Sequence, residues 1–232
     1  RRLIPTLLLV LFFMVPLAWI YLIPESFIDF SKSVLYSLGF TSNFYFWFTG
    51  EAYGAESSLL KPFLHTWSLA VEEQFYILFP VILFFIYRYF KDYIAHIFLI
   101  VLLLSLVGAD WGSRNHPSLN FYILPTRAWE LLAGSVLAYF EISFGHRSKN
   151  KKLNLILPII GIILVLYSFI FFNEETFHPS IYTVTPIIGV MMIIWFSEKN
   201  YILTKLLSSK LFVGIGLISY SLYLWHYPLF AF

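Results

Sequence analysis

Long apolar runs with almost no charge recur along the whole chain, and they constrain the fold more than any other feature. The hydrocarbon core of a bilayer is crossed by a helix of about 20 apolar residues. Seven segments reach or approach this length: 4–23, 63–87, 93–109, 123–140, 153–172, 181–196 and 211–232. Only 12% of the 232 residues are charged, whereas a soluble domain carries about 25%. Lipid must therefore solvate much of the exterior, and the runs do not alternate as barrel strands do.

An eighth apolar segment, 27–48, is interrupted by polar residues. It contains Asp29, Lys32 and the run Thr41-Ser42-Asn43. Irregular backbone at membrane depth has to face protein or water rather than lipid. We interpret this segment as re-entrant or interfacial, so the sequence predicts an all-α, polytopic transmembrane bundle of about seven spans, forming one domain over 1–232. We expect the natural termini to lie beyond Arg1 and Phe232, because the chain has no starting methionine and ends within an apolar run.

Lysine and arginine indicate the orientation, because cytoplasmic loops are enriched in both. The loop 146–152 is the densest basic loop, and we place it in the cytoplasm. Counting spans from it also places Arg1 and Arg2 inside, provided that 27–48 does not cross the bilayer. Anchoring by the positive-inside effect is the default role of these two arginines, and contact with the phosphates of a cytoplasmic nucleotide is the alternative.

The segment 65–76 contains the first candidate for chemistry. Glu72 and Glu73 stand well inside an apolar run, where a charged residue costs roughly 2.5–3.5 kcal/mol. On a continuous helix, His65 would share a face with Glu72 at a separation of about 10 Å, so a substrate or another helix would lie between them. The structural alternative is that the glutamates only hold helices together through hydrogen bonds.

Two further segments place polar side chains inside spans. Arg127 and Glu130 can pair on one helix face, either as a simple ion pair or as a fixed cation beside a developing negative charge. Gly134 and Ala138 offer a small surface for a close helix contact. The segment 219–228 is rich in hydroxyls and includes His226, although its tyrosines also suit an interfacial belt.

Depth connects these segments. In the predicted orientation, Glu72, Arg127, Glu130 and His226 all fall in the outer half of the bilayer, which suggests one polar chamber open to one face. A proton-coupled transporter or flippase of lipid-linked sugars would suit this chamber as well as an enzyme does. No nucleic-acid motif is present. The absence of cysteine excludes disulfides and thiolate metal sites, and no metal site is expected.

Taken together, these segments resemble the acyltransferase-3 family, the membrane enzymes that O-acetylate bacterial surface polysaccharides. The stretch 64–76 fits the family signature Trp-Ser-Leu-x-x-Glu-x-x-Phe-Tyr, and three other stretches match in order along the chain. These are Arg1–Pro5, which resembles the end of an arginine motif, and then 127–134 and 219–228.

The resemblance implies a ten-span domain, of which this chain would hold the third to ninth spans. The family's first span, with its arginine and histidine, would precede Arg1. It implies a bacterial inner-membrane enzyme that moves an acyl group, expected to be acetyl, from cytoplasmic acyl-CoA to a glycan or lipid-linked sugar such as an O-antigen. Acyl-CoA would be a substrate and not a bound cofactor. The implied roles are catalysis by Glu72, His65 and His226, substrate binding by Arg127, Glu130, Trp67 and Tyr76, and CoA binding by Arg1 and Arg2.

Overall fold

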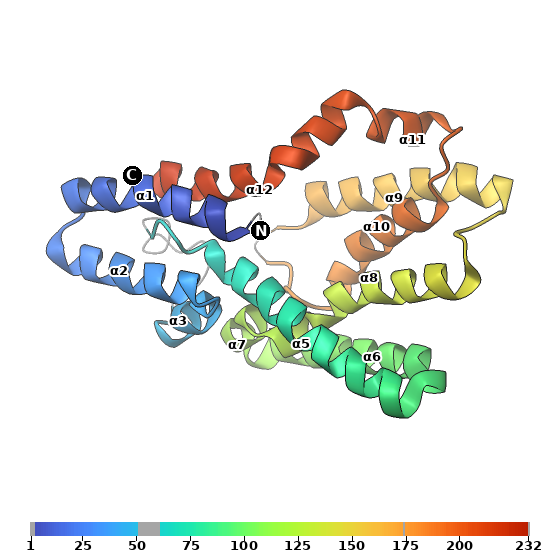
Figure 1. Ribbon diagram of the computed structural model, residues 1–232, viewed down its shortest axis with the longest axis horizontal. Coiled ribbons are helices and arrows are strands. Elements are labelled where there is room, and N and C mark those ends of the chain that lie inside the picture. The colour runs from blue at the N-terminus through green and yellow to red at the C-terminus, as the bar shows by residue number, and fades with distance from the viewer. Residues whose placement is uncertain (1–2, 51–60, 174, 232) are drawn as a thin grey trace. The chain divides into compact units, whose positions relative to one another are not determined.

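The computed structural model describes residues 3–50, 61–173 and 175–231, and every regular element in these ranges is a helix (Figure 1). This confirms the all-α prediction. The elements are α1 (Leu3–Tyr21), α2 (Pro24–Leu38), α3 (Ser42–Phe48), α5 (Thr66–Phe90), η1 (Lys91–Tyr93), α6 (Ile94–Asn115), α7 (Pro117–Tyr122), α8 (Leu124–Phe144), α9 (Lys151–Phe171), η2 (Ile181–Thr183), α10 (Val184–Phe196), α11 (Ile202–Leu207) and α12 (Lys210–Ala231).

Three stretches of the described chain are long and apolar enough to cross a membrane. They are Ile4–Tyr21, Thr66–Asn115 and Lys151–Phe171. The middle stretch has 50 residues, which corresponds to about 75 Å of helix, and η1 divides it into α5 and α6. The helices α8 and α12 have 21 and 22 residues, but their polar side chains lower their mean hydropathy. The count of seven spans stays a prediction.

The segment 27–48 is broken into two helices, as its polar interruption predicted. Phe40 adopts a φ of 52° between α2 and α3, a left-handed conformation that is uncommon for residues other than glycine. Gln74 of α5 holds this break, because its Nε2 donates to the Phe40 carbonyl oxygen and to Asn43 Oδ1, both at 2.9 Å. The position of the segment in a membrane stays a prediction.

The stretch 110–122 is polar and contains glycine and proline, so the sequence predicts one of the longest loops there, but it is helical. α6 continues to Asn115, and Asp110 pairs with Arg114 one turn later at 3.3 Å. Pro117 then occupies the first turn of α7, where its missing N–H is not needed. The loop prediction was wrong because it depended on the absence of an apolar run. Polar side chains on an exposed helix can pair with one another, so a helix can form without such a run.

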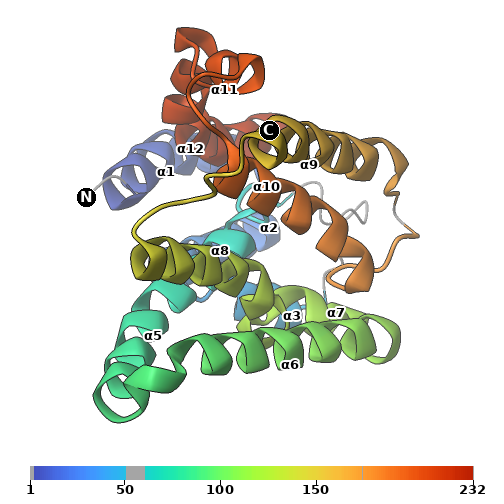
Figure 2. The ribbon, with the colours of Figure 1, turned by 90° about the vertical axis from the view of Figure 1, so that its right-hand side faces the viewer.

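The chain divides into two compact units, Arg1–Tyr76 with Gly214–Phe232, and Ile77–Val213. In the first unit, side chains of α1, α2, α5 and α12 form the apolar core, including Val10, Phe30, Leu69 and Leu224. In the second unit, α6 packs against α8 and α9 packs against α10 (Figure 2).

The contact between α9 and α10 depends on two glycines. A methyl group added to Gly161 would lie 2.5 Å from the Gly189 carbonyl oxygen, and one added to Gly189 would lie 2.6 Å from the Gly161 carbonyl oxygen. Small residues allow such close approach of helices in membranes. The predicted contact at Gly134 was wrong, since no atom of the described chain lies within 4 Å of the place a methyl group would take there.

Candidate functional site

His65 lies in the turn that leads into α5 and not on the helix itself. Hydrogen bonds from Leu64 N–H to the Lys61 carbonyl oxygen and from Thr66 N–H to the Phe63 carbonyl oxygen, both 3.0 Å, shape this turn. The His65 side chain is 1% exposed, whereas Glu72 is exposed on α5. The predicted shared helical face of His65 and Glu72 was therefore wrong, because the helix begins only at Thr66.

Three aromatic side chains of α12 surround the His65 ring. The ring centroids of Tyr223, His226 and Tyr227 lie 5.1, 5.5 and 5.4 Å from that of His65, and the Tyr227 ring is nearly parallel to it. Both ring nitrogens of His65 are buried with no hydrogen-bond partner among the described residues. Since buried polar groups are normally bonded, these two nitrogens mark His65 as a candidate for a functional role.

Tyr223 joins α12 to the turn before α5. Its hydroxyl donates to the His65 carbonyl oxygen and lies 2.6 Å from Ser68 Oγ. The single phenolic proton is used on the carbonyl, so Ser68 is the donor in the second hydrogen bond. Tyr223 thus brings the 219–228 segment against the turn that carries His65, a contact that the sequence did not predict.

The tautomer of His226 follows from its partner. Nδ1 of His226 lies 2.6 Å from the Tyr223 carbonyl oxygen. Because a carbonyl oxygen only accepts, Nδ1 carries the proton and Nε2 is the basic nitrogen of the neutral ring. The arrangement therefore provides a candidate general base on α12.

The other predicted residues of α5 lie on different sides of the helix. Trp67 is buried, whereas Tyr76 is 53% exposed, as expected for positions nine residues apart on a helix. Glu72 lies on the same exposed side as Tyr76, and Glu73 is half-buried with Oε1 enclosed. The structure does not bring Trp67 and Tyr76 together to line one pocket.

In the second unit, Arg127 and Glu130 form the predicted ion pair. Arg127 Nε lies 3.4 Å from Glu130 Oε2, and the two side chains are 20% and 22% exposed. The guanidinium also donates to the Phe121 carbonyl oxygen at 3.4 Å and lies 5.4 Å from the centre of the Phe121 ring. These contacts fix the cation at the start of α8.

The sequence reading missed His178, which belongs to the loop before η2. It is half-buried, and burial, followed by the positive charge of Arg127, lowers the pKa of His178. The ring is therefore neutral near pH 7. A single histidine in a polar loop carries no sequence signal, so only the structure relates it to Arg127.

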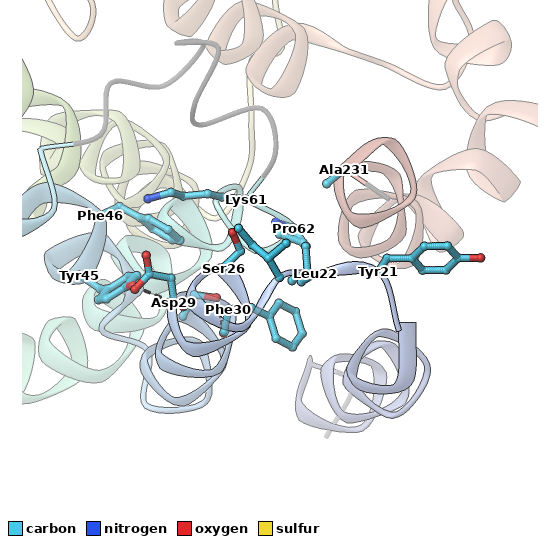
Figure 3. A pocket seen from close by; sticks show the side chains of 12 residues that line it. Tyr21, Leu22, Ser26, Asp29, Phe30, Tyr45, Phe46, Lys61, Pro62 and Ala231 are labelled. Atoms are coloured by element: carbon cyan, nitrogen blue, oxygen red, sulfur yellow. Dashed lines mark hydrogen bonds between the residues drawn. The ribbon is translucent and has the colours of Figure 1, made fainter. Parts of the chain in front are cut away.

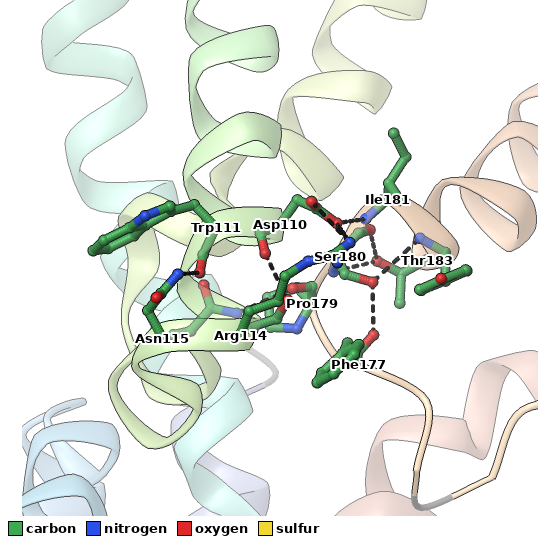
Figure 4. A network of polar contacts seen from close by, with 12 residues as sticks. Asp110, Trp111, Arg114, Asn115, Phe177, Pro179, Ser180, Ile181 and Thr183 are labelled. Atoms are coloured by element: carbon green, nitrogen blue, oxygen red, sulfur yellow. Dashed lines mark hydrogen bonds and ion pairs between the residues drawn. The ribbon is translucent and has the colours of Figure 1, made fainter.

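A polar network fixes this loop against α6 and α7 (Figure 4). Asp110 Oδ1 accepts from the Ile181 N–H at 3.3 Å, and Asn120 Nδ2 donates to the Pro179 carbonyl oxygen at 3.0 Å. Ser180 and Thr183 form a capping box at the start of η2. The segment directly after His178 is thus held at Pro179 and at Ile181.

The predicted site residues are distributed over both units. Glu72 and His226 belong to the first, and Arg127 and Glu130 to the second, so the structure describes two clusters, each by itself. Their common layer in the membrane stays a prediction. Arg1 and Arg2 lie outside the described residues.

Known proteins resemble the chain over its whole length. Residues 1–232 match the acyltransferase-3 family model, described as an acyltransferase domain. The chain is 30% identical to O-acetyltransferase OatA of Staphylococcus aureus, over 100% of this chain and 40% of that protein. It is 33% identical to peptidoglycan O-acetyltransferase OatA of Listeria monocytogenes, over 99% of this chain and 38% of that protein.

A shorter relative, from Haemophilus influenzae, is 31% identical over 87% of this chain and 85% of its own length. The chain spans about two fifths of the length of the OatA relatives. No solved structure matches it. The match of the family model to every residue is decisive: this chain belongs to the acyltransferase-3 family.

Proposed function

We propose that the protein transfers an acyl group, in the first instance acetyl, from cytoplasmic acyl-CoA to a hydroxyl of a cell-surface glycan. The observation that carries this proposal is the family match over the whole chain. The names of the two OatA relatives favour acetyl as the group transferred, and that of the Listeria protein favours peptidoglycan as the acceptor. O-antigen, another exopolysaccharide or a lipid-linked precursor are the alternative acceptors.

The reaction forms a bond between the acceptor oxygen and the acyl carbonyl carbon and breaks the carbon–sulfur bond of the thioester. The hydroxyl proton passes to a base, and the departing thiolate takes up a proton. Nε2 of His226 and the unpartnered nitrogens of His65 are the bases that the first unit offers. Glu72 would act as a base from the exposed side of α5 or would orient a histidine of another span.

The remaining assignments complete the proposal. The protein would cross the bacterial inner membrane several times as one acyltransferase domain over 1–232, with about seven of the family's ten spans and with α2 and α3 not crossing. Arg1 and Arg2 would hold the phosphates of CoA at the cytoplasmic face. Arg127 and Glu130, fixed by their mutual contact at 3.4 Å, would shape the acyl or acceptor pocket together with Trp67 and Tyr76.

The test supplies the full-length protein, in membrane vesicles, with acetyl-CoA labelled in its acetyl group and with peptidoglycan or its lipid-linked precursor. We expect label to appear as an ester in the glycan in proportion to the acyl-CoA consumed. Label that never enters any glycan, with intact lipid-linked sugar crossing the bilayer instead, would establish the transporter alternative and overturn the proposal.

A further inference from the structure

A cavity of about 570 Å³ opens at one end of the first unit (Figure 3). It lies close to the ends of four helices. Tyr21 is the last residue of α1, Ser26 is in the first turn of α2, Lys61 and Pro62 precede α5, and Ala231 ends α12. The volume falls within the range of about 300–1,000 Å³ that is typical of small-ligand sites.

We propose that this cavity binds a sugar residue of the acceptor glycan and presents its hydroxyl to the His65–His226 cluster. The inference rests on the proposed function and deepens it, because it assigns a place and a set of residues to the acceptor. Two features support this assignment: the chemistry of the cavity wall, and the elements that the cavity shares with His65 and His226.

One wall of the cavity is aromatic and firmly packed. Tyr45 and Phe46 are buried, and their rings meet edge to face at 5.2 Å. The Tyr45 ring also stacks on Tyr36 at 4.9 Å, and its hydroxyl donates to the Asp29 carbonyl oxygen at 3.3 Å. An aromatic surface held in this way suits the apolar C–H face of a sugar ring.

Other groups in the wall of the cavity are polar and charged. The Asp29 carboxylate, whose side chain is 54% exposed, lies 3.6 Å from the ammonium group of Lys32. Ser26 and Lys61 also line the cavity, and Lys61 belongs to a different segment of the wall from Asp29 (Figure 3). A carboxylate only accepts and an ammonium group only donates, so together they satisfy hydroxyls, which do both. Sugar hydroxyls can bond to such groups in addition to the contacts these groups already make, whereas an acyl chain cannot, and this chemistry therefore favours a sugar.

The cavity and the histidine cluster share two elements, the turn before α5 and the helix α12. The turn Lys61–His65 contributes to the cavity at its first two residues and carries the buried imidazole at its last. On α12, His226 and Ala231 are five residues apart, about 7.5 Å along the helix axis. In the predicted orientation this end of the unit faces outward, which is where a surface glycan is found.

Kinetics of the full-length protein provide the first test. Asp29→Asn keeps the shape of the side chain and removes its charge. We expect an acceptor KM raised about tenfold, with the KM for acyl-CoA and kcat unchanged. Glu25→Gln is the matched control, because Glu25 is in the first turn of the same helix and does not line the cavity. An unchanged acceptor KM in Asp29→Asn would overturn the assignment.

A second test does not depend on activity. The chain contains no cysteine, so Ser26→Cys places one thiol at the cavity in a full-length protein kept free of other cysteines. We expect a soluble peptidoglycan disaccharide to slow alkylation of this thiol by a maleimide at least threefold, and to leave Glu25→Cys unaffected.

The two proposals fail in different ways. Failure of the wild-type protein to transfer acetyl groups would refute the proposed function. Normal transfer with no protection of Ser26→Cys would refute only the sugar site.

Discussion

His226 is the residue whose chemistry is best defined, because its Nδ1 is committed to the Tyr223 carbonyl oxygen at 2.6 Å. Asparagine can imitate an Nδ1–H donor but offers no base. We therefore expect His226→Asn to keep the helix contact and to lower kcat about 10²- to 10⁴-fold, measured as labelled acetyl transfer. His96→Asn, on the exposed side of α6, is the matched control. Wild-type turnover in His226→Asn would exclude this histidine from the reaction.

Glu72 provides a second prediction at this scale. Glu72→Gln preserves volume on an exposed face of α5, so the protein should reach the membrane in normal amount, as measured by immunoblot. Its acetyl transfer should be abolished, because glutamine neither takes up a proton nor orients a cationic imidazole. Activity equal to that of the wild type would remove Glu72 from the catalytic assignment.

His178 predicts a dependence of stability on pH. Burial and the charge of Arg127 lower its pKa in the folded protein, so the unfolded chain binds more protons below the ordinary value of about 6.5. Stability from this residue is complete above that pH and is lost as the pH falls. We expect the thermal midpoint to fall less between pH 7 and pH 5 in His178→Gln than in the wild type. Equal falls would show that His178 does not contribute.

At the scale of the elements, alanine substitutions at two glycines test the α9–α10 contact. Gly161 belongs to this contact, and Gly108 does not. Gly161→Ala would force a methyl group to 2.5 Å from the Gly189 carbonyl oxygen, and we expect a loss of about 1–3 kcal/mol. Gly108→Ala in α6 meets no described atom within 4 Å, so the gain in helix propensity should leave stability equal or higher. Thermal unfolding in detergent measures both, and equal midpoints would contradict the role of the contact.

The helices were predictable where apolar runs set their length, as for α1, α5 and α9. The sequence also indicated the break near Thr41, because polar residues interrupt an apolar segment there. It did not indicate α7 or α11, since helices of six residues are too short to produce an apolar run of spanning length. It pointed to Gly134 for close packing instead of Gly161, because a small-residue pattern does not show which helix is its neighbour.

At the scale of the whole molecule, the predicted orientation can be checked with single cysteines, because the chain has none of its own. We expect Glu175→Cys to react with a membrane-impermeant maleimide in intact cells, and Lys149→Cys to react only after the membrane is opened, because the basic loop is assigned to the cytoplasm. The reverse pattern would invert the topology and move the proposed sugar site to the inner face.

The site itself was only partly predictable at this scale. Motifs identified His65, His226, Arg127 and Glu130, but counting depth along straight helices could not show that His65 precedes its helix or that its neighbours come from α12. Such contacts depend on side-chain packing between segments far apart in sequence. That information is not contained in the periodicity of any single segment.

The hydrogen bond between Ser68 and Tyr223 joins residues 155 positions apart. At a synthesis rate of about 5–20 residues per second, roughly 8–30 s pass between the appearance of the first residue and that of the second. During this interval the ribosome produces the entire second unit, Ile77–Val213, while the turn that carries His65 waits without Tyr223, His226 and Tyr227. The candidate catalytic cluster is therefore completed only after the second unit has been synthesised, so a nascent chain that stops short of α12 cannot assemble it.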